Sequence, residues 1–554
     1  MHLFKKYMSV LTAVMLLFCV NACKDEDEGE LAPWFRFTNS NGVVFPSLNE
    51  VDFGAHEYVM NVYTNINWEV TSDAEWLYAT PDKRLGCVQG KIIIKENTVE
   101  EERTGTITVR SENPKLPVHT IVFHQSAAPH KVEKLFITPE KKGTGDGWTW
   151  ENAMGAKELE TLLSDATDLS EISIYLSEGT FNITAGTNIT KKVKSIEGGY
   201  TPEGEPSSNP TILTFGTKPS ALTSMFRMNE NAEVTFKNCI FDGGYNETEK
   251  GYGRAFEIRH KTALLQLTEC DIQHFSVRGT DSGDHSGAAI FVTEGAFRLN
   301  KVNITHNVVH QRGEIYLNVD GDRYGYGFMN NVLIADNISE SWWGVAIHAK
   351  KALCMNNVTI CNNTNEGNGN HATINGSGSF FIANTTVIAQ NPTVETTWTN
   401  FGAFRCETNV SSGESAVIIN SIFGNDTDDG LTMTDSGSGA SFKSGGWCLY
   451  GKTQNWLVSQ QATTDTSYTD QAIAKLGKYE DGAFQWNPTA INTLQFAKYA
   501  DILKAAKEFT PASIPTLGQD FVNWMGEEAF GLDGKGNPRN PNRMLPGAYD
   551  TGLQ

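Results

Sequence analysis

A short pattern of apolar and polar residues recurs through the chain from about residue 132 onward. Each copy begins with a polar residue, most often Asn, ends on an apolar residue three positions later, and returns at roughly 30-residue intervals. Two or three strands of this length cannot bury an apolar face alone, so the copies must stack on one another. The copies are Asn238-Cys-Ile-Phe241, Glu269-Cys-Asp-Ile272, Lys301-Val-Asn-Ile304, Asn331-Val-Leu-Ile334, Asn357-Val-Thr-Ile360, Asn384-Thr-Thr-Val387 and Asn420-Ser-Ile-Phe423.

This stacking predicts parallel strands wound into coils, with equivalent residues about 4.8 Å apart. Asn suits the tight corner of such a coil, because it tolerates left-handed backbone and its amide can bond to the coils above and below. The unequal spacing indicates loops of different length between the coils. A second Asn follows several copies, at Asn307, Asn337, Asn363 and Asn391.

The coil phrases and their flanks resemble the right-handed parallel β-helix of pectin-lyase-like proteins. At the start, Gly147-Trp-Thr-Trp-Glu-Asn-Ala153 and a helical pattern over 157–166 resemble the helix that caps the open end of such a stack. At the end, Asp533-Gly-Lys-Gly-Asn-Pro-Arg539 and Gly547-Ala-Tyr-Asp550 resemble their closing phrase. The resemblance implies one domain over 132–554. We expect a helical or capping segment from about 470 to 554, with the helical pattern itself over 470–507.

Residues 35–128 show the strand patterns of a small β-sandwich, which makes the expected fold class all-β throughout. Thr64-Asn-Ile-Asn-Trp-Glu-Val70, then Trp76, then Arg103-Thr-Gly-Thr-Ile-Thr-Val109 resemble a BACON domain, a Bacteroidetes-associated carbohydrate-binding family with an Ig-like sandwich. The resemblance implies either carbohydrate binding or a spacer. Trp68 and Trp76 fit core positions as well as sugar platforms, because a small sandwich needs large apolar side chains inside.

Residues 1–22 have the order of a bacterial secretion signal, with a positive start and an apolar stretch too short to span a bilayer. Val20-Asn-Ala-Cys23 resembles a lipobox, which implies cleavage before Cys23 and lipid on its thiol; ordinary signal-peptide cleavage is the alternative. Residues 23–34 form an acidic tether. Its acidic run resembles the signal that sends lipoproteins of Bacteroidetes-type bacteria to the outer face of the outer membrane, with periplasmic anchoring as the alternative.

Composition narrows the partners. The 554 residues carry a net charge of −21 and no basic cluster, which argues against nucleic acid and leaves the lipid as the expected membrane contact. The nine cysteines are irregularly spaced and no CxxC pair suggests zinc, so no cofactor is expected. Cys239 and Cys270 fall one coil apart in the same register. They fit a ladder of small buried side chains better than a disulfide, although their expected separation permits either.

A second recurring phrase predicts another stack of strands: Gly287-Ala-Ala-Ile-Phe-Val292, Gly344-Val-Ala-Ile-His348 and Gly402-Ala-Phe-Arg405, with Gly253-Arg-Ala-Phe-Glu257 as a looser copy. If its last branched or aromatic residue points inward, alternation turns the following residue outward. The predicted outward column then holds Glu257, Phe291, His348 and Arg405, and also Asn375 if Ile374 is the equivalent inward residue. Arg259, Thr293, Lys350 and Glu407 follow two residues later, also outward.

This column fits two chemistries. A glycan-binding groove would use its polar and aromatic members, together with loop tryptophans that stack on sugar rings. The candidates for that role are Glu257, Phe291, Asn375, Glu407, Trp342 and Trp343, and the other aromatic residues expected in loops are Tyr324, Tyr326 and Trp398. A polysaccharide lyase needs a base for the C5 proton of a uronic acid and cations for its carboxylate. The candidates for catalysis are Lys350, Arg405, His348 and Arg259.

Two further interpretations have less support. A glycoside hydrolase needs two carboxylates at a fixed separation, whereas Glu257 and Glu407 are several coils apart, so a lyase is favoured over a hydrolase. Asp320-Gly-Asp322 could hold Ca²⁺, although two acids in a Gly-containing loop more often make a solvated turn. Charged residues also occupy outward strand positions without any function.

Three functions therefore remain open. The first is a surface lipoprotein that binds or presents to extracellular polysaccharide or glycoconjugate through a β-helix platform. The second is a lyase acting on a uronic-acid glycan, and the third is a surface adhesin or structural β-helix. Whether the chain is an enzyme stays undecided at this point.

Overall fold

The computed structural model describes residues 32–165, 168–279, 283–319, 323–340, 343–367, 370–389, 402–408, 410–425, 431–435, 442–454, 460–468, 477–480, 483–487 and 494–549. The chain divides into two compact units, the first ending at Lys131 and the second beginning at Val132. Over the described ranges, every helix is too short or too polar to cross a membrane.

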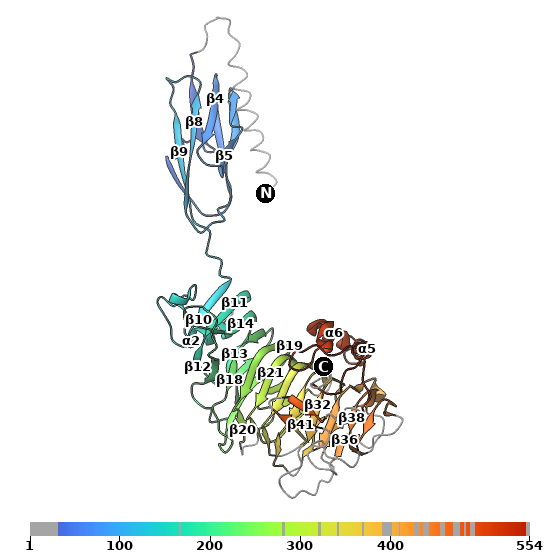
Figure 1. The fold of residues 1–554 in the computed structure, drawn as a ribbon. Coiled ribbons are helices and arrows are strands. Elements are labelled where there is room, and N and C mark those ends of the chain that lie inside the picture. The colour runs from blue at the N-terminus through green and yellow to red at the C-terminus, as the bar shows by residue number, and fades with distance from the viewer. Residues whose placement is uncertain are drawn as a thin grey trace. The chain divides into compact units, whose positions relative to one another are not determined.

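The first unit is a β-sandwich, as the sequence predicts (Figure 1). Alternate residues of its strands point into one shared core, as in β8, which buries Ile107 and Val109. Trp68 belongs to this core and donates its indole N–H to the carbonyl of Gly86. One sheet has the order β1 (Phe35–Asn39), β3 (His56–Thr64), β7 (Val88–Ile94) and β5 (Leu77–Thr80). The other has the order β2 (Leu48–Val51), β9 (His119–Gln125), β8 (Arg103–Ser111), β4 (Asn67–Ser72) and β6 (Lys83–Leu85).

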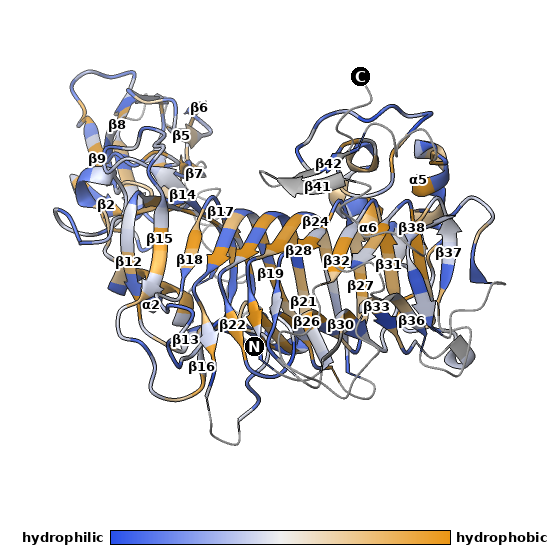
Figure 2. Cartoon of the chain, turned by 60° about the horizontal axis from the view of Figure 1, so that its bottom comes forward, coloured by the Kyte–Doolittle hydropathy of each residue, from blue (hydrophilic) through white to orange (hydrophobic). Residues whose placement is uncertain are grey.

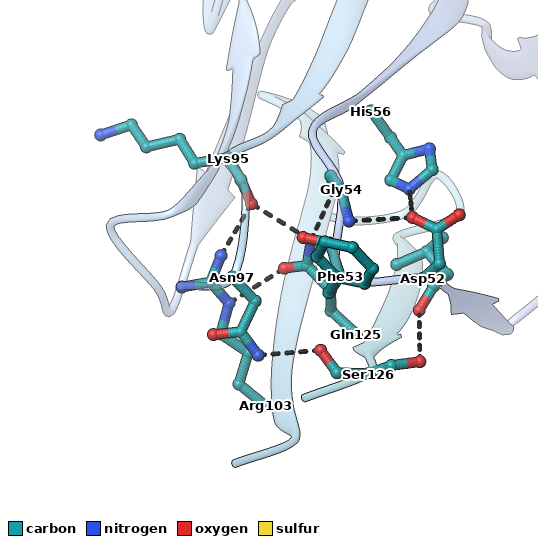
Figure 3. Close-up of polar contacts among 10 residues, drawn as sticks. Asp52, Phe53, Gly54, His56, Lys95, Asn97, Arg103, Gln125 and Ser126 are labelled. Carbon is teal, nitrogen blue, oxygen red and sulfur yellow. Dashed lines mark hydrogen bonds and ion pairs between the residues drawn. The ribbon is translucent and has the colours of Figure 1, made fainter. Parts of the chain in front are cut away.

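A network of side-chain hydrogen bonds around Gln125 lies at one end of this sandwich (Figure 3). The buried Gln125 amide donates to the carbonyls of Phe53, Gly54 and Lys95, and its own oxygen accepts from Arg103 Nε at 2.9 Å. Asn97 donates to Ser126 O at 2.9 Å. These bonds satisfy main-chain groups that the strand ladders leave over, so the Gln at the end of β9 has a structural role.

The second unit is a sheet of parallel strands that winds on itself, which is consistent with the predicted β-helix. Its strands form three walls, here named A, B and C, that follow one another within each coil. Three strands bend around corners: β19 (Tyr252–Gln273) and β21 (Ile290–Thr305) pass through all three walls, and β24 (Gly325–Ala335) through walls A and B.

The remaining strands belong to one wall each. Wall A holds β10 (Lys134–Ile137), β11 (Leu169–Ser177), β14 (Lys192–Tyr200), β17 (Glu233–Lys237), β27 (Ala352–Asn356), β31 (Phe380–Ala383), β34 (Ala416–Ile419) and β37 (Lys443–Gly446). Wall B holds β12 (Gly179–Ile183), β15 (Thr211–Phe215), β18 (Ile240–Asp242), β28 (Thr359–Cys361), β32 (Thr386–Ala389), β35 (Ile422–Asn425), β38 (Leu449–Tyr450) and β40 (Thr466–Ser467). Wall C holds β13 (Thr187–Ile189), β16 (Thr223–Met228), β23 (Ile315–Leu317), β26 (Trp343–Ala349), β30 (Asn370–Gly376), β33 (Gly402–Cys406), β36 (Leu431–Asp435) and β39 (Lys452–Gln454). A short ladder after wall B holds β20 (Ser276–Val277), β22 (Val308–Val309), β25 (Ile338–Ser339) and β29 (Thr364–Asn365).

The corner between walls A and B lies at the first residue of the recurring Asn phrase. All seven copies have left-handed backbone there, with φ from 48° at Asn384 to 56° at Glu269. The second Asn forms an amide ladder, in which Asn307 donates to Asn337 at 3.1 Å and Asn337 to Asn363 at 2.9 Å. Cys239 and Cys270 are buried free thiols, so the small-residue ladder is the correct interpretation of this pair.

Helices cover the coil at its start and on its side. At the start, α2 (Ala156–Ser164) buries Leu159 and Leu163 in the same core as the first strands, as expected of the capping helix. Later, α5 (Tyr499–Lys507), α6 (Leu517–Met525) and the 3-10 turn η4 (Glu527–Gly531) pack on the outer face of wall A, over the later coils (Figure 2). The short turns η1 (Trp150–Asn152) and η2 (Val410–Ser412) lie in loops.

The predicted helix over 470–507 is wrong for its middle part. Residues there form a hairpin of β41 (Gly477–Glu480) and β42 (Ala483–Trp486), and the helix begins only at Tyr499. The segment Tyr479 to Trp486 alternates apolar and polar residues around Asp481-Gly482, a pairing that favours a turn between two strands over a helix. The chain after η4 lies along the outer face of wall B, where Leu545, Ala548 and Tyr549 pack on Ile422 and Leu449.

Candidate functional site

The predicted outward column exists on wall C, with one residue from each successive coil. Strand pairing places Glu257 beside Phe291, Phe291 beside Tyr316, and Tyr316 beside His348. It then places His348 beside Asn375 and Asn375 beside Arg405. The complete column reads Asn188, Arg227, Glu257, Phe291, Tyr316, His348, Asn375, Arg405, Thr434 and Gln454.

Five members of the column were not placed from the sequence: Asn188, Arg227, Tyr316, Thr434 and Gln454. In the β23 coil Glu314 stands where the recognised copies have Ala before the inward residue. The structure pairs Ile315 with Ile290 and Ile347, which turns Tyr316 outward. Arg227 lies in Met225-Phe-Arg-Met228, one coil before the first recognised copy. Alternation around the buried Phe226 was the signal that could have identified it.

An arginine cluster surrounds Glu257 at the start of the column. Arg259 Nη2 lies 2.9 Å and Arg227 Nε 3.7 Å from Glu257 Oε2, and the Ser224 hydroxyl donates to the same oxygen at 3.1 Å. Burial alone would raise the pKa of Glu257, but the hydrogen bond from Arg259 and the charge of Arg254 lower it overall. The carboxylate is therefore ionised at neutral pH, and the four side chains together carry two net positive charges.

Arg254 is the buried member of this cluster. Its Nε donates to Ser286 O at 2.9 Å, another guanidinium nitrogen donates to Asp284 O, and its guanidinium lies 4.2 Å from the centre of the Phe291 ring. Burial lowers the pKa of Arg254 to about 10, which leaves it charged at neutral pH. In the next coil Arg312 lies 5.4 Å from the centre of the Tyr316 ring. Arginines of the chain itself thus already pack on the two aromatic rings of the column.

The middle of the column is buried. Tyr316, His348 and Asn375 are 1%, 6% and 1% exposed, and Asn375 Nδ2 lies 3.3 Å from His348 Nδ1. The His348 ring also packs edge-on against Tyr316 at 5.1 Å and Trp343 at 6.2 Å. Lys350 donates to Asn318 Oδ1 at 2.9 Å. His348 and Lys350 are therefore held by neighbouring side chains.

Solvent reaches the column again at Arg405. Arg405 Nη2 pairs with Glu407 at 2.8 Å, and 22% and 31% of these two side chains are exposed. Arg405 Nε is buried without a hydrogen-bond partner, as is Arg227 Nε at the other end. Wall C thus presents two partly exposed polar ends, one around Glu257 and one at Arg405, separated by a packed middle.

Several predicted residues lie outside the described residues: Cys23, Trp342, Trp398, Asn391 and the weak Ca²⁺ candidates Asp320 and Asp322. Thr293 does not follow the second column, because β21 bulges and pairs Glu294 with Arg259 instead. Over the ranges that the structure describes, no group of three or more His, Cys, Asp or Glu side chains is placed to hold a metal ion.

The comparison with known proteins concerns mainly the first unit. Residues 48–123 match the family model described as the viral BACON domain. The first unit carries a BACON domain. No curated protein matches the chain.

Two solved structures show a weak likeness. One is a Bacteroides ovatus GH5 xyloglucanase in complex with an XXXG heptasaccharide, 11% identical, with a TM-score of 0.15 over 48% of this chain and 72% of that one. The other is the Agl-KA catalytic domain, 11% identical, with a TM-score of 0.22 over 78% of this chain and 86% of that one. A likeness this low carries no information on activity.

Within the BACON domain the two predicted tryptophans differ. Trp68 is 2% exposed and is one of the residues that line an open hollow of about 740 Å³, together with Arg84 and Glu112. Trp76 is partly buried, and the Arg103 guanidinium lies 4.4 Å from the centre of its ring. Both tryptophans therefore contribute to the packing of the sandwich.

Proposed function

We propose that this chain is a cell-surface lipoprotein that binds an acidic extracellular polysaccharide along the outer face of wall C. One observation carries the proposal. In a chain of net charge −21, Arg227, Arg254 and Arg259 gather around a single carboxylate, and 28% of the Arg227 and 40% of the Arg259 side chain is exposed. Guanidinium groups bind carboxylates and sulfates through two parallel hydrogen bonds, the geometry that a uronic acid or a sulfated sugar offers.

The architecture supports a polymer as the ligand. Coils repeat about every 4.8 Å along one axis, so an extended chain can contact the neighbouring coils that carry Arg227 and Arg259. The helices α5 and α6 cover the later coils of wall A, and the chain after η4 covers later coils of wall B, whereas wall C carries the outward column. The BACON domain is in keeping with a carbohydrate-related surface protein.

The anchor belongs to the same proposal. Cleavage before Cys23, a lipid on its thiol and the acidic run that follows would hold the chain at the outer membrane, facing outward. In that position the polymer-binding wall meets extracellular glycans, while a periplasmic location would offer it few long polysaccharides.

Affinity electrophoresis of the full-length chain in gels containing polygalacturonate tests the proposal, with dextran as a neutral polymer. The double variant Arg227→Ala/Arg259→Ala should bind polygalacturonate about tenfold more weakly, equivalent to about 1.4 kcal/mol. The matched control Lys301→Ala/Lys535→Ala removes two exposed positive charges elsewhere and should stay within about twofold of the parent. Equal retardation of both double variants would contradict binding at wall C.

The same incubations separate binding from catalysis. Release of unsaturated products from polygalacturonate, lost in Lys350→Ala, would replace the binding function by a lyase. Attachment to mucin or host cells without retardation by any polysaccharide would instead favour an adhesin.

A further inference from the structure

The outer face of wall A changes from polar and partly exposed to apolar and covered at the edge of α6. One column of this face runs from Thr235 through Gln266, Arg298 and Phe328 to Cys354 and Phe381. From Phe328 onward the column is apolar and covered, since Phe328 packs against Phe521 at 5.1 Å and Trp524 at 5.8 Å. Before Phe328 the column is polar and partly exposed. The apolar cover that α6 provides over Phe328 thus ends beside Arg298, and this boundary is here named the step.

Tyr324 directly precedes β24, lies close enough to Asp520 of α6 and to Arg298 for their charges to act on its pKa, and has 43% of its surface exposed. Its carbonyl accepts from Gly295 N at 2.9 Å, and its ring packs edge-on against Tyr326 at 5.7 Å, so the ring is held in place. Burial, together with Tyr326 and Asp520 of α6, raises the pKa of Tyr324 to about 12. The phenol therefore keeps its proton at all physiological pH values and can donate it to a ligand.

Arg298 supplies a cation at the same place. Its Nη2 donates to the Tyr326 hydroxyl at 3.0 Å, and its guanidinium lies 5.6 Å from the centre of the Phe328 ring. Among the described residues Arg298 forms no ion pair, although the chain has 65 acidic against 44 basic residues. Gln266 beside it donates to Thr235 Oγ1 at 3.2 Å and leaves its carbonyl oxygen for a further donor.

We infer that this step is a second carbohydrate site, with a pyranose ring stacked on Tyr324 and the carboxylate of a uronic acid held by Arg298. An exposed aromatic ring, a guanidinium without a carboxylate and a planar amide are the groups that a charged sugar needs for stacking and for hydrogen bonds. The site lies on wall A and uses none of the residues of wall C. Its test is therefore independent of the test of the wall C site. If both sites bind, one polymer could contact two faces of the coil.

The test uses the full-length chain and the same polygalacturonate and dextran gels. Tyr324→Ala should weaken binding of polygalacturonate about three- to tenfold. Tyr324→Phe keeps the ring, so its loss of binding should be less than half of the loss in Tyr324→Ala. Tyr78→Ala is the matched control, because Tyr78 is another exposed tyrosine with a nearby cation, 41% exposed and 5.7 Å from Lys95 Nζ. Arg298→Gln should remove most of the preference for the acidic polymer and leave the urea midpoint within the range of the other variants.

The outcomes for the two walls are separate. Loss in Tyr324→Ala with no loss in Arg227→Ala/Arg259→Ala would support the wall A site and contradict wall C. The reverse pattern would overturn the wall A site and support wall C. Equal retardation of Tyr324→Ala and Tyr78→Ala overturns the inference, as does a parent chain that neither polymer retards. A lower urea midpoint in Tyr324→Ala, together with parent-like binding by Tyr324→Phe, would indicate that Tyr324→Ala loses binding only because it is less stable. In that case Arg298→Gln must itself show the three- to tenfold weaker binding of polygalacturonate, and its absence overturns the inference.

Discussion

Glu314 is fully buried next to Ile315, with neither carboxylate oxygen exposed and neither hydrogen-bonded. Burial raises the pKa of Glu314 well above its ordinary value of 4.5, since nothing nearby compensates the charge. Folding therefore favours the protonated form of this group. In the unfolded chain it ionises near its ordinary pKa, so it couples folding to pH.

The sign of this coupling can be worked out. Between pH 4.5 and the raised folded pKa, the folded state holds one proton more than the unfolded state. Stability from this group therefore falls as pH rises through that window, by at most about 1.4 kcal/mol per pH unit. Urea unfolding should be measured at pH 5.5 and pH 7.5 for the parent and for Glu314→Gln. The midpoint should fall between pH 5.5 and pH 7.5 by more in the parent than in Glu314→Gln. An identical pH dependence in parent and variant would show that Glu314 is ionised or solvated in the folded chain.

Single positions also show how the stack decides backbone conformation. Glu269 and Lys301 occupy corner positions that Asn fills in the other copies, and they adopt φ of 56° and 55°. A left-handed residue of this kind costs about 1–2 kcal/mol, and it persists because the coils on both sides fix the corner. The position in the stack thus overrides the preference of the residue.

At the scale of elements, an amide ladder ties five coils together at the end of wall A. Asn420 donates to Asn384, Asn384 to Asn356, and Asn356 to Asn330, each at 2.8 Å. Asn330 then donates to Asn300 at 2.9 Å. The inner amides Asn330, Asn356 and Asn384 each donate to one coil and accept from the next. Removing Asn356 therefore takes a partner from the Asn384 amide N–H, from Asn330 Oδ1 and from the carbonyl of Ala529.

Asn356→Leu should therefore lower the free energy of unfolding by about 2–5 kcal/mol, because each unpaired buried group costs about 1–3 kcal/mol. The matched control is Asn303→Ala, which breaks an exposed amide bond of 2.8 Å to Asp271 between neighbouring coils. That control should change stability by no more than about 0.5 kcal/mol. Urea unfolding followed by intrinsic fluorescence measures both. Similar losses in the two variants would mean that the ladder adds nothing beyond an ordinary surface bond.

The elements differ in how far the sequence predicts them. The coil strands and the register of wall C follow from alternation and repetition, because inward residues such as Ile290 and Ile347 mark the same position in each copy. Arg227 and Tyr316 were missed because Met225 and Glu314 stand in their coils where the recognised copies have Ala. The hydrogen bonds from Arg254 to the carbonyls of Ser286 and Asp284 could not be predicted at all, since they join a strand to the loop that precedes the strand of the following coil. Contacts made by insertions follow no period, and the candidate site consists largely of such contacts.

At the scale of the whole molecule, the order of the parts along the chain supports the proposed role of the anchor. In the proposed function, a lipid on Cys23 is followed along the chain by an acidic tether, the BACON domain and the long coil, so the proposed polymer-binding walls would be the parts farthest from the anchor in sequence. In this proposal each part has a separate physical task, and the fold of the coil does not require the anchor. Loss of the anchor should therefore change location without changing binding.

Cys23→Ser tests this separation. The parent should partition into the detergent phase of Triton X-114 and be degraded by proteinase K added to intact cells, because its lipid holds it at the outer face. The variant has no thiol for the lipid and should move to the aqueous phase or the medium, with unchanged retardation in polygalacturonate gels. Substitution of Asp25, Glu26, Asp27 and Glu28 by alanine keeps the lipid and should protect the chain from proteinase K, since it removes the acidic run. Protection of the parent on intact cells would instead place it on the periplasmic side, and the glycan that it binds would then have to be one that enters the periplasm.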